Sequence, residues 1–351
     1  MLRQGNIRPY HWADKTMSVL RANQLEACEK DLASLPFRCL FDSDCTDADA
    51  ENFYQLSFFP WEDRAHPAGA LHTADELRIR VLASFAPELA LLSPEEHDLM
   101  VRLVLFGGRL PLHDWNDLLP ARCLIRRLWC RIRKEEDGVT ALYMPHQLCG
   151  AALLLLAGDE HKKIRDAVEL VINSVDDSLY LTGMTQASVP MLHLQSLLKD
   201  TCAENRPDLI ERLFLSGCDC IYGPDGRLML IHPGLADPDR MLAQMPVAAR
   251  SFQEMSADTL AHASESVNDL ENPLYEQMLF SLMNAVRPEI TPEDAVEDLI
   301  ILAKQGVSYA EMTEVLSSLL VSLPTPEMLA ALRDLSDRIP RWIWFSSSRL
   351  Q

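Results

Sequence analysis

Signatures of helix starts recur along this chain, and they constrain its fold more than any other feature. The segments Thr73–Glu76, Ser93–Glu96 and Thr291–Asp294 each begin with a hydroxyl residue and end with an acidic residue three positions later. Such a pair satisfies the free backbone N–H groups at a helix start. Apolar residues follow each start at intervals of three and four, the period of a helix with one buried face. These patterns predict an all-α protein.

The helical patterns differ along the chain, and this predicts three regions in series. Residues 12–35 have the period of a first helix, and four plain amphipathic patterns follow Pro246. Between them, helices alternate with longer, partly extended loops. We therefore expect an N-terminal helical segment with an acidic loop over residues 1–70, a helical-repeat region over 71–245, and an acidic helical bundle with an aromatic tail over 246–351.

Composition excludes several classes of protein. The chain of 351 residues carries 52 acidic and 32 basic side chains, a formal net charge of −20. This argues against direct nucleic-acid binding, which depends on positive charge to release counterions. No apolar stretch follows the first basic residues, so no signal peptide is expected. The apolar run Leu148–Gly158 is far shorter than the roughly 20 residues of a membrane-spanning helix, and it predicts a buried helix.

The cysteines indicate a reducing compartment. There are nine, an odd number, and they are spread through helical patterns rather than arranged as a disulfide framework. In a chain of this size they are expected to be reduced thiols that pack as small apolar residues. We expect a cytoplasmic protein, and export by an unrecognised route stays open.

The acidic stretch Asp42–Glu51 raises the question of a calcium loop. Its alternating carboxylates are the hard oxygen ligands that calcium prefers. The expected glycine is missing, however, and the twelfth position counted from Asp42 is Phe53 rather than a glutamate. The sequence therefore favours a solvated loop whose carboxylates cap helices.

A weak internal repeat lies in the central region. Leu209, Ile210, Leu213 and Phe214 form one face of a short helix, which Gly217 is expected to end in the left-handed conformation. Together with the turn at Asp225-Gly226, this unit resembles the second helix and hairpin loop of an ankyrin repeat. Three histidines then stand near the openings of successive units, although their spacings of 47 and 39 residues exceed the family's period of about 33. The positions assigned to the repeat are His146, His193, Gly217, Asp225, Gly226 and His232.

The resemblance implies that these histidines are structural, with rings that bond the backbone across turns. It also implies an extended, concave protein-binding surface built from stacked helices. A second resemblance lies in Ser322–Glu327 and continues to Trp344. It is similar to the closing helical module of type III secretion gatekeeper proteins, and it implies an all-helical regulator without enzymatic activity.

Sequence motifs for catalysis, cofactors or metals are missing. The chain has no phosphate-binding glycine loop, no dinucleotide turn, no His-Glu-x-x-His and no nucleophile elbow. Cys218 and Cys220 are too close together for a usual zinc pair. His146 and Cys149 are three residues apart on a helix, a frequent coincidence. We expect no enzyme, no cofactor and no metal site.

Two charged or aromatic segments are candidate contact sites. The segment 122–134 has the period of a basic amphipathic helix, which forms either a solvated face, a site for an acidic partner, or a dock for the acidic C-terminal region. That region, residues 252–340, holds 16 acidic and 4 basic side chains. The aromatic tail after it either plugs the last helices or anchors a partner. The partner-binding candidates are Arg122, Arg126, Arg127, Arg131, Arg133, Trp342, Trp344 and Phe345.

The sequence thus predicts a non-enzymatic protein-binding protein, an adaptor, regulator or effector-type scaffold. Its expected partner is another protein, of complementary charge where the contact is electrostatic; we expect no direct nucleic-acid contact and no membrane span, and the oligomeric state stays open. Three alternatives remain: a gatekeeper-like secretion regulator, an acidic decoy of a basic nucleic-acid-binding protein, and an enzyme without a recognisable motif.

Overall fold

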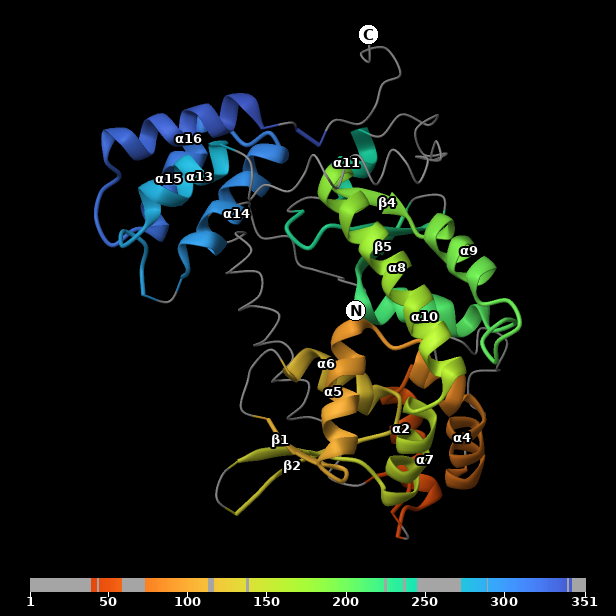
Figure 1. The fold of residues 1–351 in the computed structure, drawn as a ribbon. Coiled ribbons are helices and arrows are strands. Elements are labelled where there is room, and N and C mark those ends of the chain that lie inside the picture. The colour runs from red at the N-terminus through yellow and green to blue at the C-terminus, as the bar shows by residue number, and fades with distance from the viewer. Residues whose placement is uncertain are drawn as a thin grey trace. The chain divides into compact units, whose positions relative to one another are not determined.

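The described part of the chain forms two compact units (Figure 1). The central unit holds the described residues up to 171 together with 190–217. The C-terminal unit holds 172–189 and the described residues from 218 onward. The chain therefore contributes to each unit twice, whereas the sequence predicts regions in series. The computed structural model describes residues 39–42, 44–58, 73–112, 117–136, 139–223, 226–235, 238–244, 273–288, 290–339 and 341–342.

Most of the described residues are helical, and two small antiparallel sheets accompany the helices. The all-α prediction is therefore confirmed only as a mostly helical fold. In and around the central unit the elements are α2 (Asp47–Leu56), α4 (Ala74–Ala90), α5 (Pro94–Leu105), β1 (Arg109–Pro111), α6 (Leu118–Arg126), β2 (Arg131–Lys134), β3 (Thr140–Tyr143), α7 (His146–Leu156), α8 (Asp159–Thr182), α9 (Ser188–Leu197) and α10 (Pro207–Gly217). Helices α8 and α9 each carry the chain from one unit into the other.

The predicted helix starts of the central unit are confirmed. The hydroxyl of Thr73 accepts a hydrogen bond from the N–H of Glu76 at 3.2 Å, and the Glu76 carboxylate accepts one from the N–H of Thr73 at 2.9 Å. Ser93 and Glu96 form the same reciprocal pair at the start of α5. Helix α5 ends at Gly107-Gly108, where both residues have positive φ, as glycine allows at little cost.

The carboxylates of the acidic loop cap a helix and bind an arginine. Asp49 accepts a hydrogen bond from the N–H of Thr46 at 2.9 Å, and together these residues cap α2. Asp42 pairs with Arg131 at 2.7 Å. The prediction of helix-capping carboxylates is therefore confirmed.

The predicted basic helix over 122–134 is wrong. Helix α6 ends at Arg126, Leu128 follows with a φ of 61°, and the chain is extended as β2 from Arg131 to Lys134. A leucine in the left-handed region cannot continue a helix. The spacing of the apolar residues fits a helix, but the strand pairs with β3 in a hairpin, and this pairing decides its conformation.

One apolar core of the central unit packs the helices from α2 to α7 together. Trp129 is fully buried, and its ring meets the ring of Phe85 edge-on with centroids 4.7 Å apart. Helix α5 packs against α6 and α7, and α4 packs against α7. The core therefore joins helices that lie far apart in the sequence.

The C-terminal unit combines a sheet with four packed helices. The sheet strands are β4 (Met184–Gln186), β5 (Asp219–Tyr222) and β6 (Leu228–Ile231), and α11 (Pro238–Gln244) follows them. Buried apolar residues from all four helices form one continuous core. The predicted helix starts at Thr291 and Pro326 are confirmed. The four helices are α13 (Pro273–Leu282), α14 (Pro292–Lys304), α15 (Tyr309–Leu319) and α16 (Pro326–Arg338).

The two sheets are built to the same plan. Each is three-stranded and antiparallel with the third strand in the middle, in the orders β1-β3-β2 and β4-β6-β5. Their three strands have three, four and four residues in both cases, and five residues join the last two strands. In each sheet, the first residues of the two outer strands both pair with the last residue of the central strand.

The hydrogen bonds at the ends of the sheets match as well. A glycine with positive φ precedes the first strand of each, Gly108 in one and Gly183 in the other. The residue after the central strand donates its N–H to that glycine: Met144 to Gly108 at 2.8 Å, and His232 to Gly183 at 2.9 Å. The sequences 88 residues apart also agree at Cys130 and Cys218, at Asp137-Gly138 and Asp225-Gly226, at Leu142 and Leu230, and at Pro145 and Pro233. The two sheets therefore share their strand order, their register and the hydrogen bonds at their ends.

The positions assigned to the ankyrin-like repeat have varied surroundings. His146 at the start of α7 and His193 in the middle of α9 are exposed. His232 is largely covered, and its Nδ1 accepts the N–H of Gly234 at 3.0 Å. Gly226 has the positive φ expected of its turn, and Asp225 lies outside the described residues. Gly217 lacks the predicted left-handed conformation. A Cβ there would lie 3.0 Å from the Cβ of Ser93, so close packing favours this glycine.

Candidate interaction surface

The basic side chains that the sequence offers as contacts are largely used inside the central unit. Arg127 is buried, Arg131 binds Asp42, and the guanidinium of Arg126 lies 4.5 Å from the ring centre of Phe58. Arg122 is half-buried, and Arg133 is exposed on β2. Arg127 is paired inside the chain, and for all five arginines the partner contact stays a prediction.

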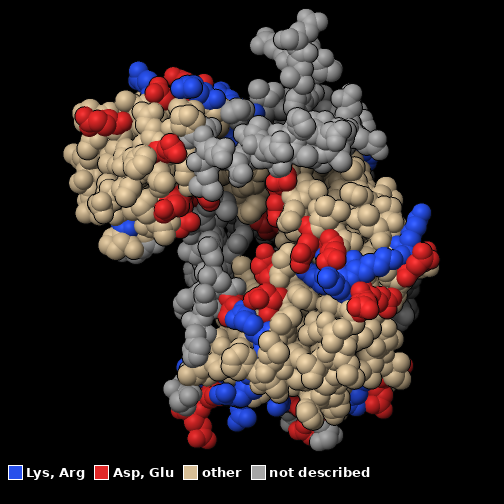
Figure 2. All heavy atoms as spheres, viewed as in Figure 1, with Lys and Arg blue, Asp and Glu red and all other residues tan. Residues whose placement is uncertain are grey.

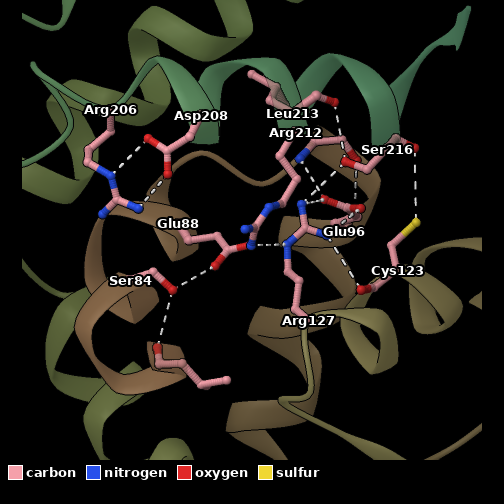
Figure 3. A network of polar contacts seen from close by, with 12 residues as sticks. Ser84, Glu88, Glu96, Cys123, Arg127, Arg206, Asp208, Arg212, Leu213 and Ser216 are labelled. Atoms are coloured by element: carbon pink, nitrogen blue, oxygen red, sulfur yellow. Dashed lines mark hydrogen bonds and ion pairs between the residues drawn. The ribbon is translucent and has the colours of Figure 1, made fainter. Parts of the chain in front are cut away.

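Arg127 is the centre of a buried ion-pair network (Figure 3). Its guanidinium lies 3.2 Å from the carboxylate of Glu88 on α4 and 3.1 Å from that of Glu96 on α5. Arg212 on α10 also pairs with Glu88, to which Ser84 donates a hydrogen bond at 3.2 Å. The four charged side chains are at most 4% exposed. Two cations and two anions thus balance each other away from solvent.

Burial shifts the pKa values in this network. Loss of solvent raises the pKa of Glu88 to about 7, while Arg127 and Ser84 act in the opposite direction. Burial also lowers the pKa of Arg212 to about 9. Such groups could serve catalysis, but these are fully enclosed and already bonded to one another. The network joins α4, α5 and α10 and has the character of structural support.

A pair of histidines forms another titratable cluster in the central unit. The Nε2 atoms of His97 and His161 lie 3.0 Å apart. Burial is the main cause that lowers the pKa of His97 to about 4, and it lowers the pKa of His161 as well; Arg165 nearby adds to both shifts. The two rings are therefore neutral at pH 7, with one donating to the other. Within the part of the chain that the structure describes, no three His, Cys, Asp or Glu side chains converge as a metal site would require.

The aromatic tail is a plug at the position that the structure describes. Trp342 is 7% exposed, its Nε1 donates to the carbonyl of Tyr180 at 2.9 Å, and its ring lies 5.2 Å from that of His232. It packs against the sheet of the C-terminal unit together with Met184 and Met241. This burial favours the plug over the partner anchor at Trp342. Trp344 and Phe345 lie outside the described residues.

Helix α7 exposes an apolar face, contrary to the prediction of a buried helix. Only three of its side chains are buried, those of Leu148, Cys149 and Ala152. Leu153 is 55% exposed and Leu154 is 78% exposed. The helix carries no Asp, Glu, Lys or Arg. Its high apolar content predicts burial on all sides, but α4 and α5 cover one side only.

The neighbouring helix α4 also exposes apolar side chains. Ile79 is 69% exposed and Leu82 is 54% exposed, and α4 packs directly against α7. Figure 2 shows the surface over these helices, at the lower right of the view, as largely free of charged side chains. We call Ile79, Leu82, Leu153 and Leu154 the α4–α7 face. Exposed aliphatic groups of this kind mark sites of contact with other molecules.

A second exposed apolar group lies on the C-terminal unit. Phe280 and Met283 lie at the end of α13, with 71% and 52% exposure, and Val321 and Leu323 precede α16 with 71% and 85%. The backbone bond from Val321 to Ala285 at 3.0 Å brings the two segments together. We call these four side chains the α13–α16 patch. Acidic side chains are spread over the visible surface of these helices (Figure 2).

Comparison with known proteins assigns no family. No family model, no curated protein and no solved structure matches this chain. Over the described residues, none of the helices is long and apolar enough to cross a membrane. No disulfide is found between the cysteines that the structure describes.

Proposed function

We propose that the protein is a non-enzymatic protein-binding protein, an adaptor or regulator, and that the α4–α7 face is its contact surface. The exposure of Leu154 on an uncharged helix is the observation that carries this proposal. Burying one leucine side chain fully is worth about 1.5–3 kcal/mol, so four large aliphatic groups offer a partner substantial free energy. The buried ion pairs of α4, α5 and α10 keep the supporting helices in place, and preorganisation of this kind favours binding.

The proposal is tested by placing a charge on the face. Leu154→Glu is expected to leave folding intact, because the side chain is already 78% exposed. Tagged wild-type and variant chains are purified by affinity from the source cells. The Leu154→Glu variant is expected to lose the main partners that purify with the wild type. Leu323→Glu, at an 85% exposed leucine of the other unit, is the matched control. If Leu154→Glu retains every partner, the α4–α7 face is not the contact surface.

A secretion regulator of the gatekeeper type is the second candidate. The segment that resembles this family includes Leu323, and the exposure of Leu323 beside Val321 in the α13–α16 patch favours the idea. The variants Leu154→Glu and Leu323→Glu also test this second candidate, with their expected effects exchanged. A gatekeeper-like role predicts that Leu323→Glu, rather than Leu154→Glu, releases secretion components. The ankyrin-like resemblance stays a prediction and is not needed for either proposal.

A further inference from the structure

We infer that the occupant of the α4–α7 face is a second copy of this chain, with the α7 helices of the two copies packed antiparallel. In this arrangement Leu154 of each copy fills the notch at Gly150 of the other. The inference rests on the proposed function, because it assigns a partner to the same face. It follows from three observations: the glycine in α7, the lack of charged side chains on α7, and the comparison of α7 with α11, the helix that follows the second sheet.

The fold of a single chain gives no reason for a glycine at position 150. It lies inside α7 and is exposed, and a Cβ added there would meet nothing within 4 Å. Glycine destabilises a helix interior relative to alanine, so this position has a cost without a gain in the isolated chain. Gly108 and Gly183 differ, since each has a positive φ. A glycine on an exposed helix permits another helix to approach closely.

Gly150 and Leu154 are self-complementary. They are four residues apart, so they lie one above the other on the same side of α7. A two-fold axis between them places Leu154 of each copy opposite Gly150 of the other, and the contact is made twice. Contacts that repeat in this way are typical of two-fold dimers, in which both copies use the same surface.

Charge favours a second copy at this face in particular. Two chains with a net charge of −20 repel each other over most approaches. Helix α7 has no ionisable acid or base apart from His146, so contact there does not oppose like charges. Ile79 and Leu82 on α4 are exposed as well and add apolar surface to that of α7.

The second sheet is also followed by a helix, and the apolar side chains of that helix are covered. Helix α11 follows the second sheet as α7 follows the first. Its Met241 and Leu242 are 7% and 6% exposed, and they belong to a core with Ile301 and Trp342. In the C-terminal unit a later part of the chain thus covers this helix. In the central unit the outer leucines of α7 have no such cover and stay exposed.

The oligomeric state of the full chain tests the inference. Sedimentation equilibrium of the purified protein is expected to show a monomer–dimer equilibrium. Leu154→Glu is expected to give monomers, while Leu323→Glu leaves the dimer unchanged. Gly150→Ala is the sharper variant. It is expected to raise the thermal midpoint of the monomeric form by about 2 °C, because alanine favours the helix, and to weaken dimerisation about tenfold, because its methyl group fills the notch.

Each other outcome overturns the inference. A wild-type chain that stays monomeric at 100 µM (roughly the range of weak dimers) has no such interface. A dimer that survives Leu154→Glu uses another surface, and a dimer indifferent to Gly150→Ala lacks the notch contact. If the chain is monomeric but Leu154→Glu still releases cellular partners, the inference fails while the proposed function stands. If Leu154→Glu changes neither the oligomeric state nor the set of cellular partners, the inference and the proposed function both fail.

Discussion

Replacing Arg127 tests the most unexpected assignment, that a residue of the basic segment supports the core. We expect Arg127→Met to lower the free energy of unfolding by about 3–5 kcal/mol, the typical cost of breaking a buried ion pair. The magnitude follows from what the substitution leaves behind. Glu88 keeps Arg212 and Ser84 as partners. Glu96 loses the guanidinium and keeps neutral partners, the N–H of Ser93 and the thiol of Cys123. A carboxylate that is 2% exposed thus loses its cation.

Equilibrium unfolding in urea, followed by circular dichroism, measures this loss. Arg102→Met is the matched control, since Arg102 pairs with Asp98 and Asp117 while its side chain is 38% exposed. Solvent screening limits such pairs to about 1 kcal/mol or less. Adding Glu96→Gln to Arg127→Met removes the unpaired charge and is expected to recover part of the loss. Equal losses in the free energy of unfolding for Arg127→Met and Arg102→Met would refute the reasoning. A buried ion pair should cost more stability when broken than a pair at the surface.

Two further predictions concern the C-terminal unit. Gly183→Ala is expected to destabilise the protein more than Gly226→Ala in thermal unfolding: both glycines have positive φ, but only the Cβ at 183 would lie 2.7 Å from the ring of Trp342. Equal effects would show that Trp342 does not pack there. Burial, with a smaller effect from Lys304, lowers the pKa of His232 to about 4 from an ordinary value of 6.5. The unfolded chain therefore takes up a proton first, and stability should fall by up to about 3 kcal/mol as the pH drops from roughly 6.5 to 4. In urea titrations at pH 7 and 4.5, His232→Gln should lose less stability than the wild type, and an unchanged pH dependence would contradict the assignment.

The features that the sequence predicts correctly are local ones. The starts of α4 and α5 depend on hydrogen bonds within four residues, Thr73 with Glu76 and Ser93 with Glu96. Such short-range chemistry is visible in a single sequence. The burial of Trp342 is consistent with one of the two readings of the tail, because three large aromatic residues close together favour packing.

The features that the sequence does not predict depend on partners outside the segment itself. Strand β2 has the apolar spacing of a helix, and only its pairing with β3 makes it extended. Arg127 belongs to a run of basic residues that resembles a solvated face. Its burial depends on Glu88, Glu96 and Arg212, the last of which lies 85 residues away. Sequence spacing cannot show that separate acids and bases meet in one core.

The error over α7 is of a different kind. An eleven-residue helix without charged side chains predicts burial on every side, and the described chain buries only the side toward α4 and α5. Apolar composition reports how much cover a helix needs, but not which molecule supplies it. In the proposed dimer the second copy covers Leu154 and fills the notch at Gly150. The prediction of a buried helix, which is wrong for a single chain, then holds for the dimer. Gly150, which weakens α7 in a single chain, is the residue that permits the contact.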